Sequence, residues 1–275
     1  MKTYKNITKS IVLVLSLGLL VSACDKIDLN DVKKKVVISA NKKVLIEDFT
    51  GHKCPNCPKG HEKLHKLIEA YGDTNVFGVS IHAGFYAKPK KPPFDYDFRT
   101  EAGNTYNETF QPPAYPSGLV NRKEYNSSLV HDIGVWGTIA SAVVTETSPV
   151  NIKVEATSNN NTLSGNVELS FIDKLQENVK LQIFVTEDSI VKPQVTPTGE
   201  EENYVHMHVL RGAVNGTWGE DLPQASYAAN DTATISFSNY ALGADWKPQH
   251  LHVLAFLYNT DTKEVLQVNG TKVKP

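Results

Sequence analysis

The motif Cys54-Pro55-Asn56-Cys57 constrains this chain more than any other stretch of its sequence. It follows a strand-like apolar run, residues 44–49, and precedes a helix-like run, residues 59–71. Unsatisfied N–H groups and the positive end of the helix dipole favour a thiolate at the start of a helix. A second cysteine three residues on lies one turn away and is placed to resolve a mixed disulfide. The layout therefore predicts a strand–loop–helix unit with thiol–disulfide chemistry.

The N-terminus has the organisation of a bacterial lipoprotein signal. Three lysines precede an apolar segment, Ile11 to Leu20, that is too short to span a bilayer. Val21-Ser22-Ala23-Cys24 then matches a lipobox, in which the cysteine is acylated and becomes the first residue of the mature chain. We therefore expect residues 1–23 to be a signal peptide, residues 24–40 a polar tether, and Cys24 the lipidation site.

The cysteine count and the charge narrow the possible functions. The chain has three cysteines, and with Cys24 assigned to lipid only one pair remains. An apolar core, and not a disulfide framework, must then hold the fold together. The net charge is −2, and it becomes −5 without residues 1–23, which contain three lysines and no acids. We expect neither a nucleic-acid partner nor a cofactor.

Residues 41–147 alternate strand and helix patterns. Leu64, Leu67, Ile68 and Tyr71 recur at helical spacing, and they form one apolar face after the cysteines. Residues 76–81 resemble a buried strand, so a βαβ unit is expected. Further elements are expected at residues 97–110 (helix), 118–121 (strand) and 133–143 (helix).

From Val150 onward the apolar residues recur with a period of two. Such alternation is typical of half-buried antiparallel strands, and clusters of Asn, Gly and Ser separate the runs. The sequence therefore predicts an all-β domain, residues 150–275, with an immunoglobulin-like sandwich. The expected fold class is α/β followed by all-β. The alternating runs are residues 150–156, 165–171, 179–185, 233–237 and 251–257.

The first domain resembles the thioredoxin-like proteins. Asp48 stands six residues before Cys54, and Tyr115-Pro116 precedes a strand-like run. In that family an acid at this position is buried and accepts the proton of the second cysteine, while a cis-proline faces the disulfide and holds the substrate backbone. The resemblance implies that Asp48 carries a proton and that Tyr115 and Pro116 bind substrate. Lys53 stands where the family usually has tryptophan, which bears on substrate choice.

A second resemblance covers nearly the whole mature chain. The motifs at residues 50–58, 115–122 and 204–211 are similar to those of the outer-membrane-protein-28-related lipoprotein family. This resemblance implies a thioredoxin-like domain and a β domain, held by lipid on the outer membrane of a Gram-negative bacterium.

The function predicted from these features is that of a lipid-anchored thiol–disulfide oxidoreductase. Cys54 is expected to be the nucleophile, and the more exposed and more acidic thiol, because His52 and Lys53 would add positive charge. Cys57 is expected to resolve the mixed disulfide. The expected partners are protein thiols or disulfides, together with the membrane through Cys24.

Two alternatives remain open at this stage. In the first, the protein is a non-enzymatic surface lipoprotein that binds a partner through its sandwich, and the cysteines form only a structural disulfide. In the second, it is a metal carrier that uses the cysteines and nearby histidines. His206, His208, His250 and His252 form two H-x-H pairs, and each pair would share one face of a strand, so they are weak candidates for metal ligands.

Overall fold

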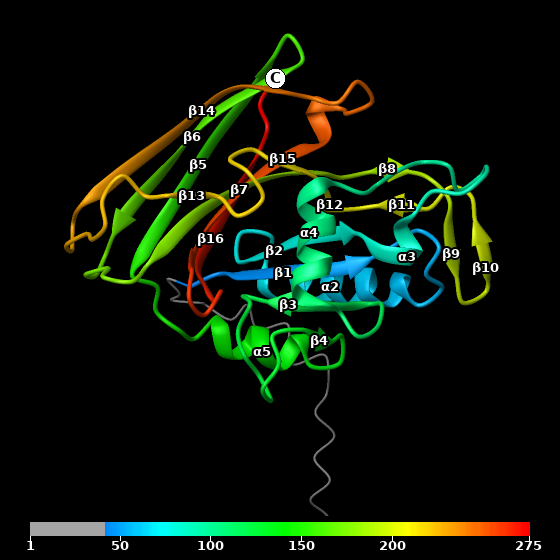
Figure 1. Ribbon diagram of the computed structural model, residues 1–275, viewed down its shortest axis with the longest axis horizontal. Helices are drawn as coiled ribbons and strands as arrows, with labels where there is room; N and C mark the ends of the chain where they lie inside the picture. The colour runs from blue at the N-terminus through cyan, green and yellow to red at the C-terminus, as the bar shows by residue number, and fades with distance from the viewer. Residues whose placement is uncertain (1–41) are drawn as a thin grey trace, which may run out of the picture. The chain divides into compact units, whose positions relative to one another are not determined.

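The computed structural model describes residues 42–275 (Figure 1). The predicted signal peptide, tether and lipidation site, Cys24, lie outside the described residues. No helix within residues 42–275 is long and apolar enough to cross a membrane.

The first half of the described chain alternates strands and helices. The predicted helix after the cysteines is confirmed, and it ends where Gly72 takes a φ of 92°. The helix predicted from residue 97 begins later, because Thr100 Oγ1 accepts the Gly103 N–H at 3.0 Å and caps it. The elements are β1 (Val44–Thr50), α2 (Cys57–Tyr71), β2 (Val76–His82), α3 (Gly84–Ala87), α4 (Glu101–Phe110), β3 (Ser117–Val120), β4 (His131–Asp132) and α5 (Trp136–Val143).

The second half is almost entirely strand. All five runs predicted from alternation lie within strands, and short strands occupy the long connection between residues 187 and 232. The elements are β5 (Val150–Asn159), β6 (Thr162–Phe171), β7 (Val179–Glu187), β8 (Ile190–Val191), β9 (Gln194–Thr196), β10 (Gly199–Glu201), β11 (Val205–His206), β12 (Val209–Ala213), β13 (Glu220–Asp221), β14 (Thr232–Ala241), the 3₁₀ helix η2 (Pro248–His250), β15 (Leu251–Asn259) and β16 (Val265–Lys272).

One mixed sheet joins strands from both halves (Figure 1). Its order is β16-β15-β7-β12-β2-β1-β3-β4, with β13 paired to β7. The β1–β2 and β2–β12 pairs are parallel. Where β12 meets β2, Val209 is the partner of Ser80, and the Ser80 N–H donates to the His208 carbonyl oxygen at 2.7 Å. A single sheet therefore crosses the predicted domain boundary between residues 147 and 150.

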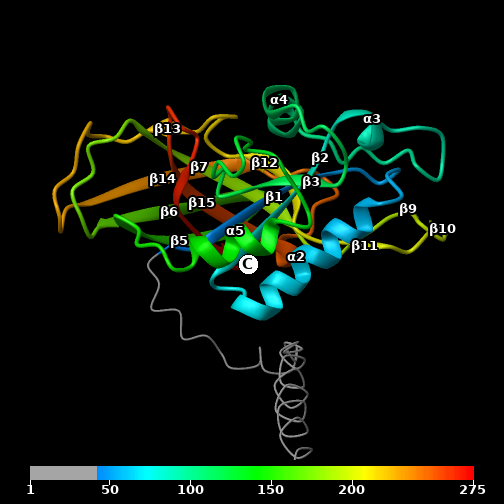
Figure 2. The ribbon, with the colours of Figure 1, turned by 90° about the horizontal axis from the view of Figure 1, so that it is seen from below.

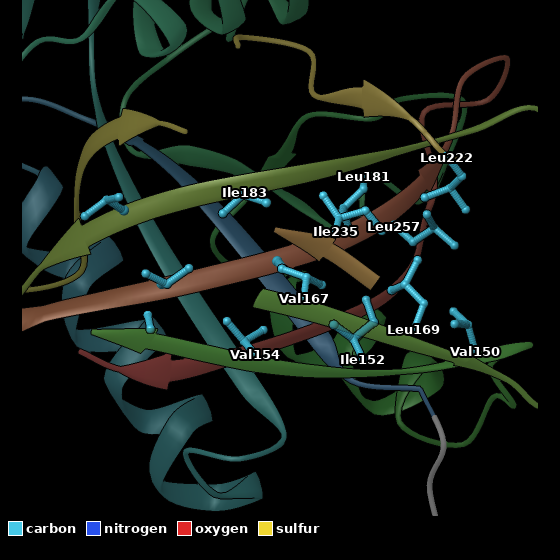
Figure 3. Packing of buried hydrophobic residues seen from close by; sticks show 14 of the residues in the cluster. Val150, Ile152, Val154, Val167, Leu169, Leu181, Ile183, Leu222, Ile235 and Leu257 are labelled. Atoms are coloured by element: carbon cyan, nitrogen blue, oxygen red, sulfur yellow. The ribbon is translucent and has the colours of Figure 1, made fainter. Parts of the chain in front are cut away.

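The two faces of the central sheet are covered differently. On one face, Leu45 and Phe49 of β1 share a core with Phe184 of β7 and Phe256 of β15, so a single core extends from end to end. On the opposite face, α2 and α5 cover the β1 end. Figure 2 shows α2 and α5 on one side of the strands and α4 on the other. The β7 and β15 end of the opposite face is covered by a second sheet, β14-β6-β5 (Figure 3).

This packing changes one sequence prediction. The expected half-buried alternation is present in β5, where buried and exposed residues alternate. It is wrong for β7 and β15, which are buried on both faces. The reason is that their side chains enter two different cores, one on each side of the sheet. The arrangement is mostly β with several helices, in one mixed sheet and several smaller sheets.

A buried ion pair of the first half is surrounded by aromatic rings from both halves. Arg122 and Glu47 are both fully buried, and two guanidinium N–H groups donate to the two carboxylate oxygens at 2.7 Å. The guanidinium carbon lies 5.0 Å from the Tyr106 ring centroid in the first half and 5.0 Å from that of Phe256 in the second. The charge is thus paired and enclosed by aromatic faces, as burial requires.

Candidate functional site

The cysteines of the C-x-x-C motif form a disulfide at the start of α2. Cys57 is the first helical residue, and the two Cα atoms are 5.4 Å apart. Cys54 is 1% exposed and Cys57 is fully buried. Both cysteines are therefore buried in the oxidised protein, and the predicted difference in exposure between them is very small.

Two segments distant in sequence hold the cysteine loop and account for its burial. The Lys53 N–H donates to the Tyr86 carbonyl oxygen of α3 at 3.1 Å. From the second half, the Val195 N–H donates to the His52 carbonyl oxygen at 2.8 Å. The buried Gln194 Nε2 donates to the Cys54 carbonyl oxygen at 3.0 Å. Figure 2 shows β9, which carries Gln194, beside the N-terminal end of α2.

Tyr115 and Pro116 lie at this disulfide. The peptide bond between them is cis, and the Tyr115 carbonyl oxygen is 3.7 Å from Cys54 Sγ. A Cβ added at Gly60, in the first turn of α2, would lie 2.9 Å from Pro116 Cβ and 3.3 Å from Asp48 Oδ2. Only glycine fits there, so the first turn of α2 packs closely on the proline and the acid. The structure thus brings together all five residues predicted for this site.

Asp48 is an ionisable group without an ion partner at bonding distance. Its side chain is fully buried, and neither oxygen has a hydrogen-bond partner among residues 42–275. The nearest basic atom is His61 Nε2, 3.7 Å from Oδ2. Burial raises the pKa of Asp48 to about 8, because the ionised form loses its hydration. Asp48 therefore holds a proton at neutral pH and titrates just above it.

His61 connects this acid to the second half of the chain. One ring nitrogen, Nε2, lies 3.0 Å from Thr50 Oγ1, and the other, Nδ1, lies 2.7 Å from the Tyr204 hydroxyl. This role of His61 was not predicted from the sequence. The available signal was its spacing to Leu64, which places it on the apolar face of α2.

Three further histidines lie near His61, around the ring of Phe98. His82 stacks on Phe98 with centroids 4.4 Å apart, while His206 lies 4.7 Å and His52 5.5 Å from the same ring. Burial lowers the pKa of His52 and of His61 to about 4 and that of His206 to about 3. His52 is therefore neutral at pH 7, and the predicted positive charge beside Cys54 comes from Lys53 alone.

The two H-x-H pairs do not meet as four imidazoles. His208 has a φ of 56° and lies between β11 and β12, so it does not share a strand face with His206. His250 belongs to η2, whereas His252 lies in β15. His208 and His252 do meet, on the two oxygens of Asp188, at 3.2 and 3.3 Å. In the described part of the chain, no three His, Cys, Asp or Glu side chains are arranged to hold a metal ion.

Comparison with solved structures shows the fold to be shared. The chain is similar to HBP35 of Porphyromonas gingivalis, with 20% identity over 86% of this chain and 78% of that one and a TM-score of 0.66. Protein AGR_C_4864 of Agrobacterium tumefaciens matches with 12% identity over 84% and 93% of the two chains and a TM-score of 0.50. A domain of the outer membrane lipoprotein Omp28 of P. gingivalis shares 22% identity over 46% of this chain and 90% of its own, with a TM-score of 0.32.

Sequence comparisons identify the family. No curated protein sequence matches the chain. The family model described as outer membrane protein Omp28 matches residues 103–275, which is more than half of the chain. The protein therefore belongs to the Omp28 family of outer membrane proteins, and its location is the outer membrane of a Gram-negative bacterium.

Proposed function

We propose that this protein is a lipid-anchored thiol–disulfide oxidoreductase that acts on protein thiols or disulfides through Cys54 and Cys57. The observation that carries the proposal is the buried, unpaired Asp48 beside the first turn of α2. Burying an acid without a partner costs free energy, and a disulfide that only braced the fold would have no use for it. A group that titrates near pH 8 is suited to exchange protons with a cysteine thiol.

The oxidised pair supports the following sequence of steps. A partner thiolate attacks Cys54 Sγ, the bond to Cys57 breaks, and Cys57 leaves as a thiolate that takes the proton of Asp48. A second partner thiolate then attacks the partner's own sulfur in the mixed disulfide and releases Cys54 as a thiolate. The partner loses two electrons and gains a disulfide, and the protein gains both electrons. With a partner disulfide the same steps run in reverse.

The proton of Asp48 needs a path to solvent. His61 and the half-buried Tyr204 extend from the acid toward the surface, with the imidazole and the hydroxyl 2.7 Å apart. We propose that this pair returns a proton to Asp48 after each cycle. The second half of the chain would then contribute Tyr204 to the chemistry of the first.

The same geometry supports the finer assignments of fold and anchor. A parallel β1–β2 pair joined by α2, with the cysteines at the helix start and a cis-proline opposite, supports a thioredoxin-like domain over residues 41–147. The packed sheets of residues 150–275 support an immunoglobulin-like sandwich.

The lipobox supports acylation of Cys24, and Cys24→Ala should release the protein from membranes. Unchanged attachment of that variant would contradict the anchor.

The burial of both cysteines favours a rival function. At 1% and 0% exposure, the disulfide resembles one that only braces the loop of a partner-binding surface protein. Oxidoreduction requires the loop to open, whereas the rival does not.

A trapping experiment separates the two functions. Cys57→Ser should accumulate mixed disulfides with envelope proteins through Cys54, and Cys54→Ser should accumulate far fewer. The wild type should also catalyse reduction of insulin by a dithiol. If neither trapped partners nor insulin reduction were observed, the oxidoreductase would be excluded and the disulfide would have only a structural role.

A further inference from the structure

An exposed aromatic and basic surface lies beside the disulfide, and the proposed chemistry does not use it. We call it the rim, and define it as Lys53, Phe85, Tyr86, Lys88 and Lys90. Phe85 is 72% exposed, the most exposed large apolar side chain among the described residues. Lys53 Nζ lies 5.3 Å from the Phe85 ring centroid and donates to the Phe85 carbonyl oxygen at 3.1 Å. These two contacts join Lys53 of the cysteine loop to Phe85 of α3, so they fix the two parts of the rim relative to each other.

The aromatic rings of the rim lead toward the reactive sulfur. The ring centroids of Phe85 and Tyr86 are 5.5 Å apart, and those of Tyr86 and Tyr115 are 5.9 Å apart. The Tyr115 carbonyl oxygen is in turn 3.7 Å from Cys54 Sγ. A chain that placed an apolar side chain on Phe85 would therefore pass close to the disulfide.

The charge of the rim is opposite to that of the molecule. The whole chain carries a net charge of −2. Burial lowers the pKa of Lys53, and the positive charges of Lys90, Lys88 and Arg99 lower it further, so basic groups surround this ammonium group. Two acids, Asp95 and Asp97, follow the rim in sequence, and the Asp97 carboxylate accepts from the Arg99 guanidinium at 2.8 Å. Lys88 and Lys90 are exposed and have no carboxylate partner among the described residues, so their charge is available to a ligand.

We propose that the rim selects the partner, docking a polypeptide segment in which acidic residues and one apolar side chain flank the reacting cysteine. Only the requirement that the partner contains a reacting cysteine rests on the proposed function. The acidic preference follows from the lysines, and the apolar contact follows from Phe85. A polypeptide is favoured over an anionic lipid surface because the rings lead to the disulfide. A polypeptide can supply a thiol that reacts with this disulfide, whereas a lipid headgroup cannot.

Two cysteine peptides test the charge preference on the oxidised full mature chain. Both carry Leu beside the cysteine, and four Glu flank it in one peptide and four Lys in the other. The second-order rate of mixed-disulfide formation should be about tenfold higher for the acidic peptide at low salt, and the ratio should approach one at high salt. Lys88→Glu with Lys90→Glu should invert the preference. Phe85→Ala should slow both peptides by a similar factor.

The control and the remaining outcomes separate docking from redox activity. Lys174→Glu with Lys272→Glu makes the same charge change at two exposed lysines outside the rim and should leave the ratio unchanged. Binding of the same peptides with Ser in place of Cys is measured by fluorescence anisotropy, which needs no exchange.

Selective binding of the acidic Ser peptide without any exchange would keep the rim and overturn the oxidoreductase. Exchange at equal rates for both peptides would keep the oxidoreductase and overturn the rim. Binding of vesicles that contain phosphatidylglycerol, with no preference between the peptides, would also overturn the proposed partner.

Discussion

Asp48 and the buried histidines beside it respond to pH in opposite directions. In the folded protein Asp48 keeps its proton to about pH 8, whereas a free aspartate releases it near pH 4. The folded state therefore binds more protons than the unfolded state within this window, and stability falls as pH rises through it. The histidines have lowered pKa values, so they bind fewer protons when folded, and stability falls as pH drops below about 6.5.

Replacement of Asp48 should separate the free energy that burial of its carboxylate costs from its role in proton transfer. Asp48→Asn removes the titration, so its free energy of unfolding should exceed that of the wild type by a few kcal/mol near pH 8 and by little near pH 4. Catalysed insulin reduction should fall on the order of 10²-fold and lose its inflection near pH 8. Urea unfolding and a pH–rate profile measure the two effects. A variant that kept the wild-type rate profile would exclude Asp48 as the proton donor.

Replacement of His82 should reduce sensitivity to acid. Because His82 is stacked on Phe98, His82→Phe keeps an aromatic ring in place while removing a group that must remain neutral. The stability lost by the wild type between pH 7 and pH 5 should shrink by about 2 kcal/mol in the variant. Denaturant unfolding at both pH values measures this. His65→Gln, at an exposed position of α2, should lose as much as the wild type; an equal effect of both variants would contradict the assignment.

At the scale of the elements, the hairpin β9–β10 controls how firmly the cysteine loop is held. β9 and β10 form a sheet of only two strands, and β9 reaches the loop through one backbone bond and the side chain of Gln194. An isolated two-stranded hairpin is marginally stable, so it is suited to move as a unit. Opening of the loop, which oxidoreduction requires, would begin with the loss of these contacts.

The hairpin contact can be weakened without touching the cysteines. Gln194→Ala removes donors to the Cys54 and Val195 carbonyl oxygens, at 3.0 and 2.8 Å, and so weakens the attachment of the hairpin to the cysteine loop. Reduction of the disulfide by a small dithiol should become about tenfold faster, as followed by alkylation and mass spectrometry. Thr198→Ala, at the exposed end of the hairpin, is the control and should react like the wild type. An unchanged rate for Gln194→Ala would mean that other contacts limit access.

At the scale of the whole molecule, the two halves share one core. Leu45 and Phe77 from the first half pack in one cluster with Phe184 and Phe256 from the second. The same sheet runs through both halves. We therefore expect residues 42–275 to unfold as one cooperative unit, because separation of the halves would expose this cluster to water.

The buried ion pair provides a test of that coupling. Arg122→Met leaves the Glu47 carboxylate buried and unpaired, and should lower the free energy of unfolding by about 3–5 kcal/mol. Because the guanidinium is enclosed by rings from both halves, two signals should shift together. They are the fluorescence of Trp136, measured with Trp218 and Trp246 replaced by Phe, and the far-ultraviolet circular dichroism of the strands. Lys123→Ala breaks a half-exposed pair with Glu146 and should cost about 1 kcal/mol or less. Two separate transitions in the Arg122 variant would contradict a shared core.

The sequence by itself determined what depends on neighbours along the chain. The strand, the cysteine pair and the helix follow one another within residues 44–71, and the alternation of β5 reflects a period of two that any half-buried strand requires. The two cysteines of the candidate site were also found in this way, because they lie on one strand–loop–helix unit. Asp48, Tyr115 and Pro116 came from a resemblance.

Tertiary structure decided everything that depends on residues far apart in sequence. Cys54 is buried because Gln194, 140 positions away, holds its loop. β7 is buried on both sides because a second sheet and the shared core enclose it. The alternation of apolar and polar residues in β7 predicts only one buried face, so it does not indicate both neighbours. A single sheet formed because β12 pairs with β2, and such pairing is selected by the packing of the whole chain and not by the pattern of either strand.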